Sequence, residues 1–293
     1  MAVLEFSNTR LHYSERGEGT PVIALHSSAS TGAQWNNLAD HLHGVHRLIM
    51  PDLPGYGKTC AWPGQGPANV ENEARLIANI IKSCNEPVHL VGHSWGGAVA
   101  LKLAMALPEW TKSLTLIEPA VFHLLRDADS DADRRLHDTI VAMAGSVAAA
   151  AACGADEEGM AQFIDFWNGD GAWARTSPRV RTMLRSQIGQ VINNFAAGFN
   201  ETWALEEAGR IACPVMALMG MQSVPLAQRV VEMLAETIPD TRLHMIPDAG
   251  HMLPLSDPHI VDPLISGHLK MADLRSQKVL RPVVAPRAFK LAA

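Results

Sequence analysis

A serine stands between two glycines in the segment G-H-S-W-G at 92–96, which has the spacing G-x-S-x-G. The segment directly follows the short apolar run 88–91 and directly precedes a stretch with helical spacing. A sharp strand-to-helix turn of this kind exposes a serine hydroxyl, and it leaves no room for side chains at the two glycine positions. The positive end of the following helix favours negative charge that develops near the serine. The pattern therefore predicts acyl-transfer chemistry with Ser94 as the nucleophile.

The elements that must hold this turn alternate along the chain. Helical patterns at 69–82, 97–107, 225–236 and 258–271 separate short apolar runs that are typical of buried strands. The expected strands are 22–25, 48–50, 88–91, 114–117, 215–219 and 243–246, preceded by an antiparallel hairpin of 3–7 and 10–14. This alternation predicts an α/β fold with a mostly parallel sheet covered by helices on both faces.

The alternation is interrupted between residues 122 and 210, where helical spacing dominates and no strand pattern occurs. We expect this segment to form a helical cap over the carboxyl edge of the sheet. Most of its aromatic residues are expected to form the core of the cap, and the remainder to line a substrate pocket. Phe166 and Trp167 are our candidates for substrate binding.

The predicted domain organisation follows from this interruption. The core comprises residues 1–121 and 211–271, the cap comprises 122–210, and 272–293 form a tail. The last four residues, 290–293, resemble residues encoded by an expression vector.

Composition narrows the function classes. Of the 293 residues, 47% are apolar, which suffices for a large core, and the formal charge of −6 disfavours a nucleic-acid partner. The four cysteines are scattered without metal-ligand spacing, so we expect buried free thiols, no metal and no cofactor. No secretion signal or apolar stretch of about 20 residues is present. We expect a soluble cytoplasmic protein with a small-molecule substrate and no membrane partner.

Four segments carry a family resemblance. They are V-I-A-L-H at 22–26, P-D-L-P-G-Y-G at 51–57, V-G-H-S-W-G-G at 91–97 and D-A-G-H-M-L-P at 248–254. In order and spacing the chain resembles the α/β-hydrolase superfamily. The resemblance implies a mostly parallel, eight-stranded sheet flanked by helices, with the helical cap inserted.

The resemblance also implies roles for single residues. His251 matches the histidine that takes the proton of Ser94 and later returns it to the leaving group. The oxyanion hole would be formed by the backbone N–H groups of Trp95 and Ser28. Ser27 departs from the family, which usually has a glycine there. His26 and His93 match positions where the family has histidines that brace the loops.

The acid of the triad departs from the commonest family pattern. Many relatives carry G-x-x-D after the strand predicted here at 215–219, but this chain has Ser223 in place of the acid. Some relatives carry the acid at the end of the preceding strand, where this chain has Glu118. We therefore predict that Glu118 pairs with His251, and the alternative is Asp248.

The expected function is hydrolysis of a carboxylic ester or lactone of a small to medium apolar substrate through an acyl-enzyme. A serine at position 94 disfavours the related chemistries that need a carboxylate nucleophile. The alternatives are a carbon–carbon bond hydrolase of the meta-cleavage type and a non-catalytic binding protein of the same fold. The residues do not distinguish ester from amide substrates, and they do not predict an oligomeric state.

Overall fold

The predicted strands pair into one sheet in the computed structural model, which describes residues 2–6, 9–61 and 69–279. The described sheet has eight strands in the order β1-β2-β4-β3-β5-β6-β7-β8. Pairing is antiparallel from β1 through β2 to β4 and parallel in the rest of the sheet. The strands are β1 (Ala2–Phe6), β2 (Thr9–Arg16), β3 (Thr20–Leu25), β4 (His46–Pro51), β5 (Val88–His93), β6 (Thr111–Ile117), β7 (Val215–Gly220) and β8 (Thr241–Ile246).

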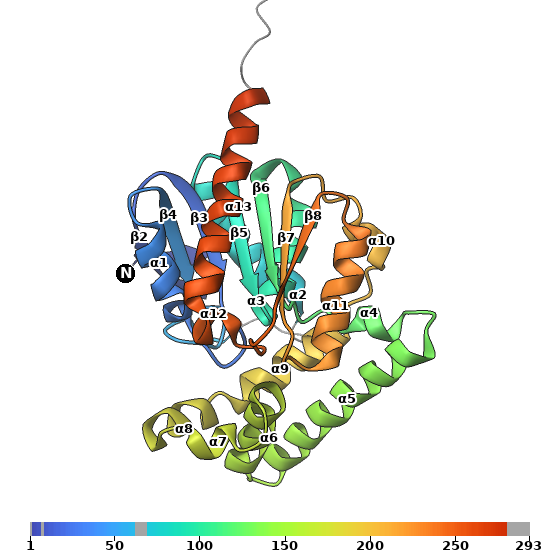
Figure 1. Ribbon diagram of the computed structural model, residues 1–293. Coiled ribbons are helices and arrows are strands. Elements are labelled where there is room, and N and C mark those ends of the chain that lie inside the picture. The colour runs from blue at the N-terminus through green and yellow to red at the C-terminus, as the bar shows by residue number, and fades with distance from the viewer. Residues whose placement is uncertain (1, 7–8, 62–68, 280–293) are drawn as a thin grey trace, which may run out of the picture.

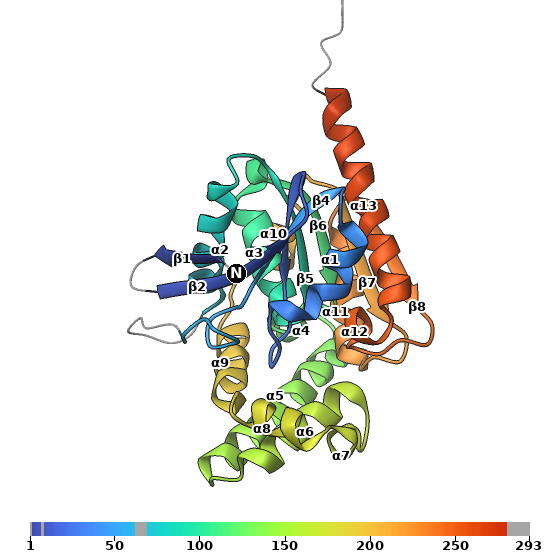
Figure 2. The same ribbon diagram turned by 90° about the vertical axis from the view of Figure 1, so that its left-hand side faces the viewer.

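Helices cover both faces of the sheet (Figure 2). Side chains alternate along a strand, so that Ile23 and Leu25 of β3 pack into one core while Val22 and Ala24 pack into the other. The first core includes α2, α3 and α11, and the second includes α1 and α13. The helices and 3₁₀ turns of this part are η1 (Gly32–Trp35), α1 (Asn36–Leu42), α2 (Val70–Ser83), α3 (Trp95–Ala106), η2 (Pro108–Trp110), α11 (Pro225–Thr237), α12 (Leu253–Ser256) and α13 (Pro258–Val279).

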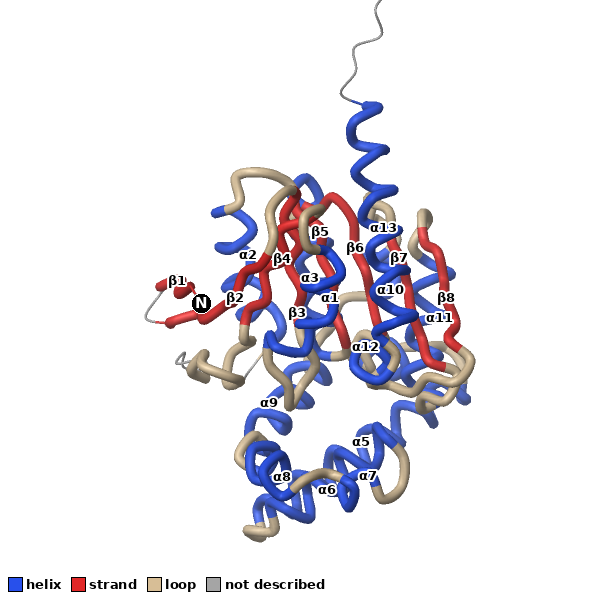
Figure 3. Tube along the Cα trace, turned by 60° about the vertical axis from the view of Figure 1, so that its left-hand side comes forward, coloured by secondary structure: helices blue, strands red, loops and turns tan. Residues whose placement is uncertain are grey.

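Seven helices lie between β6 and β7 in the described chain, where two neighbouring parallel strands are usually connected by a single helix. We call them the inserted helices; they are α4 (His123–Arg126), α5 (Asp131–Ala152), α6 (Asp156–Asn168), α7 (Ala172–Arg175), α8 (Pro178–Arg185), α9 (Ile188–Phe199) and α10 (Leu205–Ala208). The helices α5 to α9 form a layer beyond the carboxyl ends of the parallel strands, whereas α10 lies beside the sheet next to α11 (Figures 1 and 3).

The structure corrects three expectations. β8 is the last strand of the sheet and is not buried: Leu243 and Met245 are exposed, and because side chains point to the faces of a sheet, they lie where no helix covers the face. The cysteines are free, but Cys60 and Cys153 are exposed rather than buried. Helix α13 ends at Val279, eight residues beyond the predicted end of the core at 271. The predicted vector residues, 290–293, lie outside the described residues.

None of the helices in the described chain is both long and apolar enough to cross a membrane.

Candidate active site

Ser94 occupies a strained turn between β5 and α3. Its φ of 52° lies in the left-handed region, which a non-glycine residue adopts only at a cost. Its backbone N–H donates to the Ile117 carbonyl of β6 at 2.9 Å, which holds the turn against the neighbouring strand. A Cβ atom on Gly96 would lie 2.3 Å from the Leu25 carbonyl oxygen. The glycine thus allows α3 to start close against β3, and the serine hydroxyl is left at the sheet edge.

His251 and Glu118 form a buried pair near this turn. His251 lies in the loop after β8, and its Nδ1 is 2.6 Å from Glu118 Oε2 at the end of β6. Because Nδ1 faces a carboxylate, it carries the proton, and the lone pair of the ring remains on Nε2. This is the tautomer that a general base needs.

Two further groups hold the Glu118 carboxylate. The Gly220 N–H donates to Oε1 at 2.8 Å, and the Ser223 hydroxyl donates to Oε2 at 2.6 Å. Ser223, which stands where many relatives have the acid, therefore donates to the carboxylate of Glu118 instead. Asp248, the alternative, has an exposed side chain.

The two expected oxyanion donors lie at the same pocket as Ser94. Ser28 and Trp95 both line it, and neither backbone N–H donates a hydrogen bond within the described part of the chain. The Ser28 hydroxyl donates to Asn194 Oδ1 of α9 at 2.9 Å, and the Tyr56 hydroxyl donates to the same oxygen. The inserted helices thereby hold the loop that carries one of these amides.

The side chain of Trp95 is hydrogen-bonded to a carboxylate of α2. Its indole N–H donates to Glu73 Oε2 at 2.8 Å, and burial raises the pKa of Glu73 to about 8. Glu73 was not singled out from the sequence, because nothing in the spacing of α2 relates it to the turn at 92–96.

A chain of hydrogen bonds connects Ser27, which stands where the family usually has a glycine, to His251. The Ser27 N–H and hydroxyl donate to Gln34 Oε1 at 3.1 and 3.0 Å, and Gln34 Nε2 donates to His93 Nδ1 at 3.1 Å. His93 Nε2 in turn donates to the His251 carbonyl at 2.8 Å. Gln34 is the link that sequence reasoning missed, because its partners are distant in the chain.

His26 and His93, which lie in the segments 22–26 and 91–97, are neutral rings that brace the surrounding loops. His26 accepts from the Leu53 N–H at 2.9 Å and donates to the Ser27 carbonyl at 2.7 Å. Burial lowers the pKa of His26 to about 4, and burial followed by the nearby His251 lowers the pKa of His93 well below its ordinary value. Both rings are thus uncharged donors and acceptors at neutral pH.

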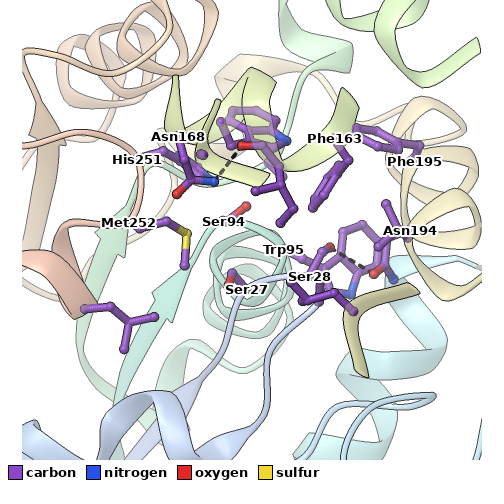
Figure 4. Close-up of a pocket in the computed structure, with 18 of the residues that line it drawn as sticks. Ser27, Ser28, Ser94, Trp95, Phe163, Asn168, Asn194, Phe195, His251 and Met252 are labelled. Carbon is purple, nitrogen blue, oxygen red and sulfur yellow. Dashed lines mark hydrogen bonds between the residues drawn. The ribbon is translucent and has the colours of Figure 1, made fainter. Parts of the chain in front are cut away.

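Ser94 and His251 open onto one cavity of about 490 Å³ between the sheet edge and the inserted helices (Figure 4). Its wall is mostly apolar, and α6 contributes Phe163, Ile164, Trp167 and Asn168. Trp167 therefore lies where we expected a substrate-contacting residue. Phe166 does not line the cavity: it lies on another face of α6 and packs edge-on against Trp167. Contact of either residue with substrate stays a prediction.

The family model for the alpha/beta hydrolase fold matches residues 20–258. The chain belongs to the α/β-hydrolase family. Its sequence is 35% identical over 114 residues to "Lipase LipV" of Mycobacterium tuberculosis, which covers 38% of this chain and 42% of the lipase. It is 33% identical over 118 residues to a 2-hydroxy-6-oxo-6-phenylhexa-2,4-dienoate hydrolase of Burkholderia cepacia, covering 39% of this chain and 41% of that enzyme. The matches thus span about two fifths of these relatives.

A solved hydrolase of Pseudomonas aeruginosa PA01 has the same fold, with a TM-score of 0.74 and 21% identity over 92% of this chain and 97% of the other.

One cluster in the described part of this α/β hydrolase has the side chains of a metal site, and it is remote from Ser94. His46, His89 and Asp273 offer ligand atoms within 4.8 Å of one another, near the amino ends of β4 and β5. The ammonium group of Lys112 lies 2.8 Å from Asp273 Oδ1. Since Lys112 already supplies the positive charge, we interpret the cluster as a network that holds α13.

Proposed function

We propose that this α/β hydrolase cleaves carboxylic esters or lactones through an acyl-enzyme formed on Ser94. The observation that carries the proposal is the Glu118–His251 contact of 2.6 Å at the cavity that Ser94 also lines. A nucleophile, a base and an acid that orients the base are the parts that acyl transfer requires.

In the first half-reaction, Ser94 Oγ attacks the carbonyl carbon of the substrate and its proton moves to His251 Nε2. The imidazolium that forms is stabilised by the carboxylate of Glu118. The carbonyl oxygen becomes an oxyanion that accepts from the backbone N–H groups of Ser28 and Trp95. Collapse of this intermediate breaks the bond to the alcohol, which takes the proton from His251.

In the second half-reaction, a water gives a proton to His251 Nε2 and attacks the acyl carbon. A second oxyanion forms at the same two amides. When it collapses, Ser94 Oγ leaves and recovers the proton, and the carboxylic acid is released. For a lactone, the alcohol and the acid are parts of the same product.

The inserted helices would act as a cap domain that selects the substrate. A cavity of about 490 Å³ with a mostly apolar wall favours a small to medium acyl or aryl group. Each additional methylene in such a cavity changes the transition-state free energy by about 1–3 kcal/mol. We therefore expect a preference for one range of acyl chain lengths.

Labelling with a fluorophosphonate and turnover of p-nitrophenyl esters of graded chain length test the proposal. We expect covalent labelling of Ser94 and measurable ester turnover. Ser94→Ala should fold normally and lose about 10⁶-fold in kcat, because the nucleophile is gone while the two amides remain. Ester turnover that survives Ser94→Ala would refute the assignment.

A carbon–carbon bond hydrolase is the second candidate, and the similarity to the Burkholderia cepacia dienoate hydrolase favours it. Against it stands the loop after β3, which has S-S-A-S at 27–30 where meta-cleavage hydrolases have glycines. Turnover of a ring-cleavage dienoate at a higher kcat/KM than any ester would favour this candidate. Ligand binding without turnover of either class would favour a binding protein.

A further inference from the structure

An indole ring from the inserted helices lies on the imidazole of His251. The ring centroids of Trp167 and His251 are 4.3 Å apart, and their planes are inclined by 30°. Both side chains are buried, with 7% of Trp167 and 3% of His251 exposed. This is a stacking contact between α6 and the loop after β8.

Two further rings hold the indole in this place. Phe122 stacks at 6.0 Å between centroids, and Phe166 contacts the indole edge-on at 5.0 Å. Phe122 lies immediately before α4, and Phe166 precedes Trp167 in α6, so the indole is contacted both from its own helix and from a second segment. The Trp167 ring is thus fixed independently of any substrate.

The stack supplies a constraint that the Glu118 contact does not. A single hydrogen bond at Nδ1 tolerates a range of angles, so the imidazole can still tilt by small rotations about its side-chain bonds. A flat ring against the imidazole face removes this freedom and leaves Nε2 directed to one place. The aromatic face also attracts the positive charge that the imidazole acquires when it takes the Ser94 proton.

We propose that Trp167 is a positioning residue for His251, through which the inserted helices control proton transfer from Ser94 Oγ to His251 Nε2. This inference rests on the proposed function, and it makes catalysis depend on α6 being seated against the sheet edge. Trp167 also lines the cavity, so its role must be separated from a simple contact with substrate.

The acyl chain length of the ester distinguishes positioning of His251 from contact with the substrate. Trp167→Leu keeps an apolar side chain but removes the stack, and we expect kcat to fall about tenfold by the same factor for acetate, butyrate and octanoate esters. Trp167→Phe keeps an aromatic face, and it should recover most of the loss. Phe163→Leu is the matched comparison, because Phe163 lies one helical turn away, lines the cavity and contacts Phe195 instead. Its effect should grow with chain length.

Fluorescence gives a readout that packing alone would not change, because an imidazolium in contact with an indole quenches its emission. The chain has seven tryptophans, so the contribution of Trp167 is the difference between wild type and Trp167→Phe. We expect the emission of Trp167 to decrease as the pH is lowered, with the same midpoint as the acid limb of kcat/KM. In a His251→Asn background, this emission should be independent of pH. The titratable groups next to His251 are Glu118 and His93, and burial keeps His93 neutral.

The outcomes separate failure of this inference from failure of the proposed function. If the fluorophosphonate does not label Ser94, the proposed function fails. If Ser94 is labelled, but Trp167→Leu impairs only long esters and the Trp167 emission does not titrate, the hydrolase stands and the positioning role is refuted.

Discussion

Both carboxylate oxygens of Glu118 accept hydrogen bonds in the site. The Gly220 amide occupies Oε1, and Ser223 and His251 occupy Oε2. Its backbone φ of 42° is in the left-handed region, so the chain accepts local strain to direct this side chain into the site. A carboxylate held this firmly can orient His251 without paying further ordering entropy during the reaction.

Replacing Glu118 by Gln should lower kcat by up to about 10⁴-fold on p-nitrophenyl acetate, because the charge that stabilises the imidazolium is lost and the histidine tautomer changes. Ser223→Ala removes one neutral donor and should cost about tenfold. Asp248→Asn is the control, and it should have little effect because its side chain is exposed. A larger loss in Asp248→Asn than in Glu118→Gln would exclude Glu118 as the acid.

Single residues could be predicted from sequence where a motif or an elimination singled them out. Ser94 and His251 lie in motifs, Ser223 has no carboxylate, and Glu118 stands at the strand end where some relatives carry the acid. The structure brings these residues together, while their catalytic roles remain predictions. Gln34 and Glu73 could not be found this way, because each acts through a partner from a distant segment and has no motif of its own.

At the scale of elements, the turn between β5 and α3 depends on glycine at 96. Gly96→Ala should lower the free energy of unfolding by about 3 kcal/mol or more, because the new Cβ would lie 2.3 Å from a backbone carbonyl oxygen. Gly145→Ala is the matched control in α5, where a Cβ would meet no described residue within 4 Å. It should stabilise the protein by about 1 kcal/mol. Urea unfolding measures both values, and equal effects would contradict the steric argument.

The inserted helices show which features of a helix can be predicted from the sequence and which cannot. Helical spacing correctly predicted helices throughout 122–210, because the signal is local. It did not predict which face of α6 would meet the cavity. Trp167 and Phe166 are adjacent and both apolar, and only the packing of α6 against its neighbours places one at the cavity and the other beside it.

At the scale of the molecule, α13 ties the amino ends of three strands together through Asp273. This carboxylate accepts from His46 of β4 at 3.0 Å, from His89 of β5 at 3.3 Å and from Lys112 of β6 at 2.8 Å. The sequence placed residue 273 in a tail, because no motif connects it to histidines 184 and 227 residues away.

Asp273→Asn should lower the free energy of unfolding by about 2–4 kcal/mol, since two buried histidines and a lysine lose a charged acceptor. Asp240→Asn is a control near the same helix, where an exposed pair with Arg275 is worth about 0–1 kcal/mol. Urea unfolding at pH 7 compares the two variants. Equal losses would mean that the network does not anchor α13.

Buried neutral histidines make the stability of the whole molecule sensitive to acid. Burial lowers the pKa of His26, His123 and His268 to about 4. The unfolded chain therefore binds protons below about pH 6.5 that the folded chain does not bind. The free energy of unfolding consequently decreases as the pH is lowered. Glu73 and Asp262 act in the opposite direction, because burial raises their pKa values to about 8 and 6. The histidines exceed these acids in number, so acid should destabilise the fold overall.

His123 allows this balance to be measured with one substitution. Its ring is fully buried and meets Trp203 edge-on at 4.6 Å between centroids, so His123→Phe keeps an aromatic ring in place. In wild type, the stability linked to this group is fully present above pH 6.5 and is lost as pH falls towards 4. The variant has no such group, so its loss of unfolding free energy between pH 7 and pH 5 should be smaller by about 2 kcal/mol. Urea unfolding of both proteins at the two pH values measures this difference, and identical losses would show that His123 is not held neutral in the fold.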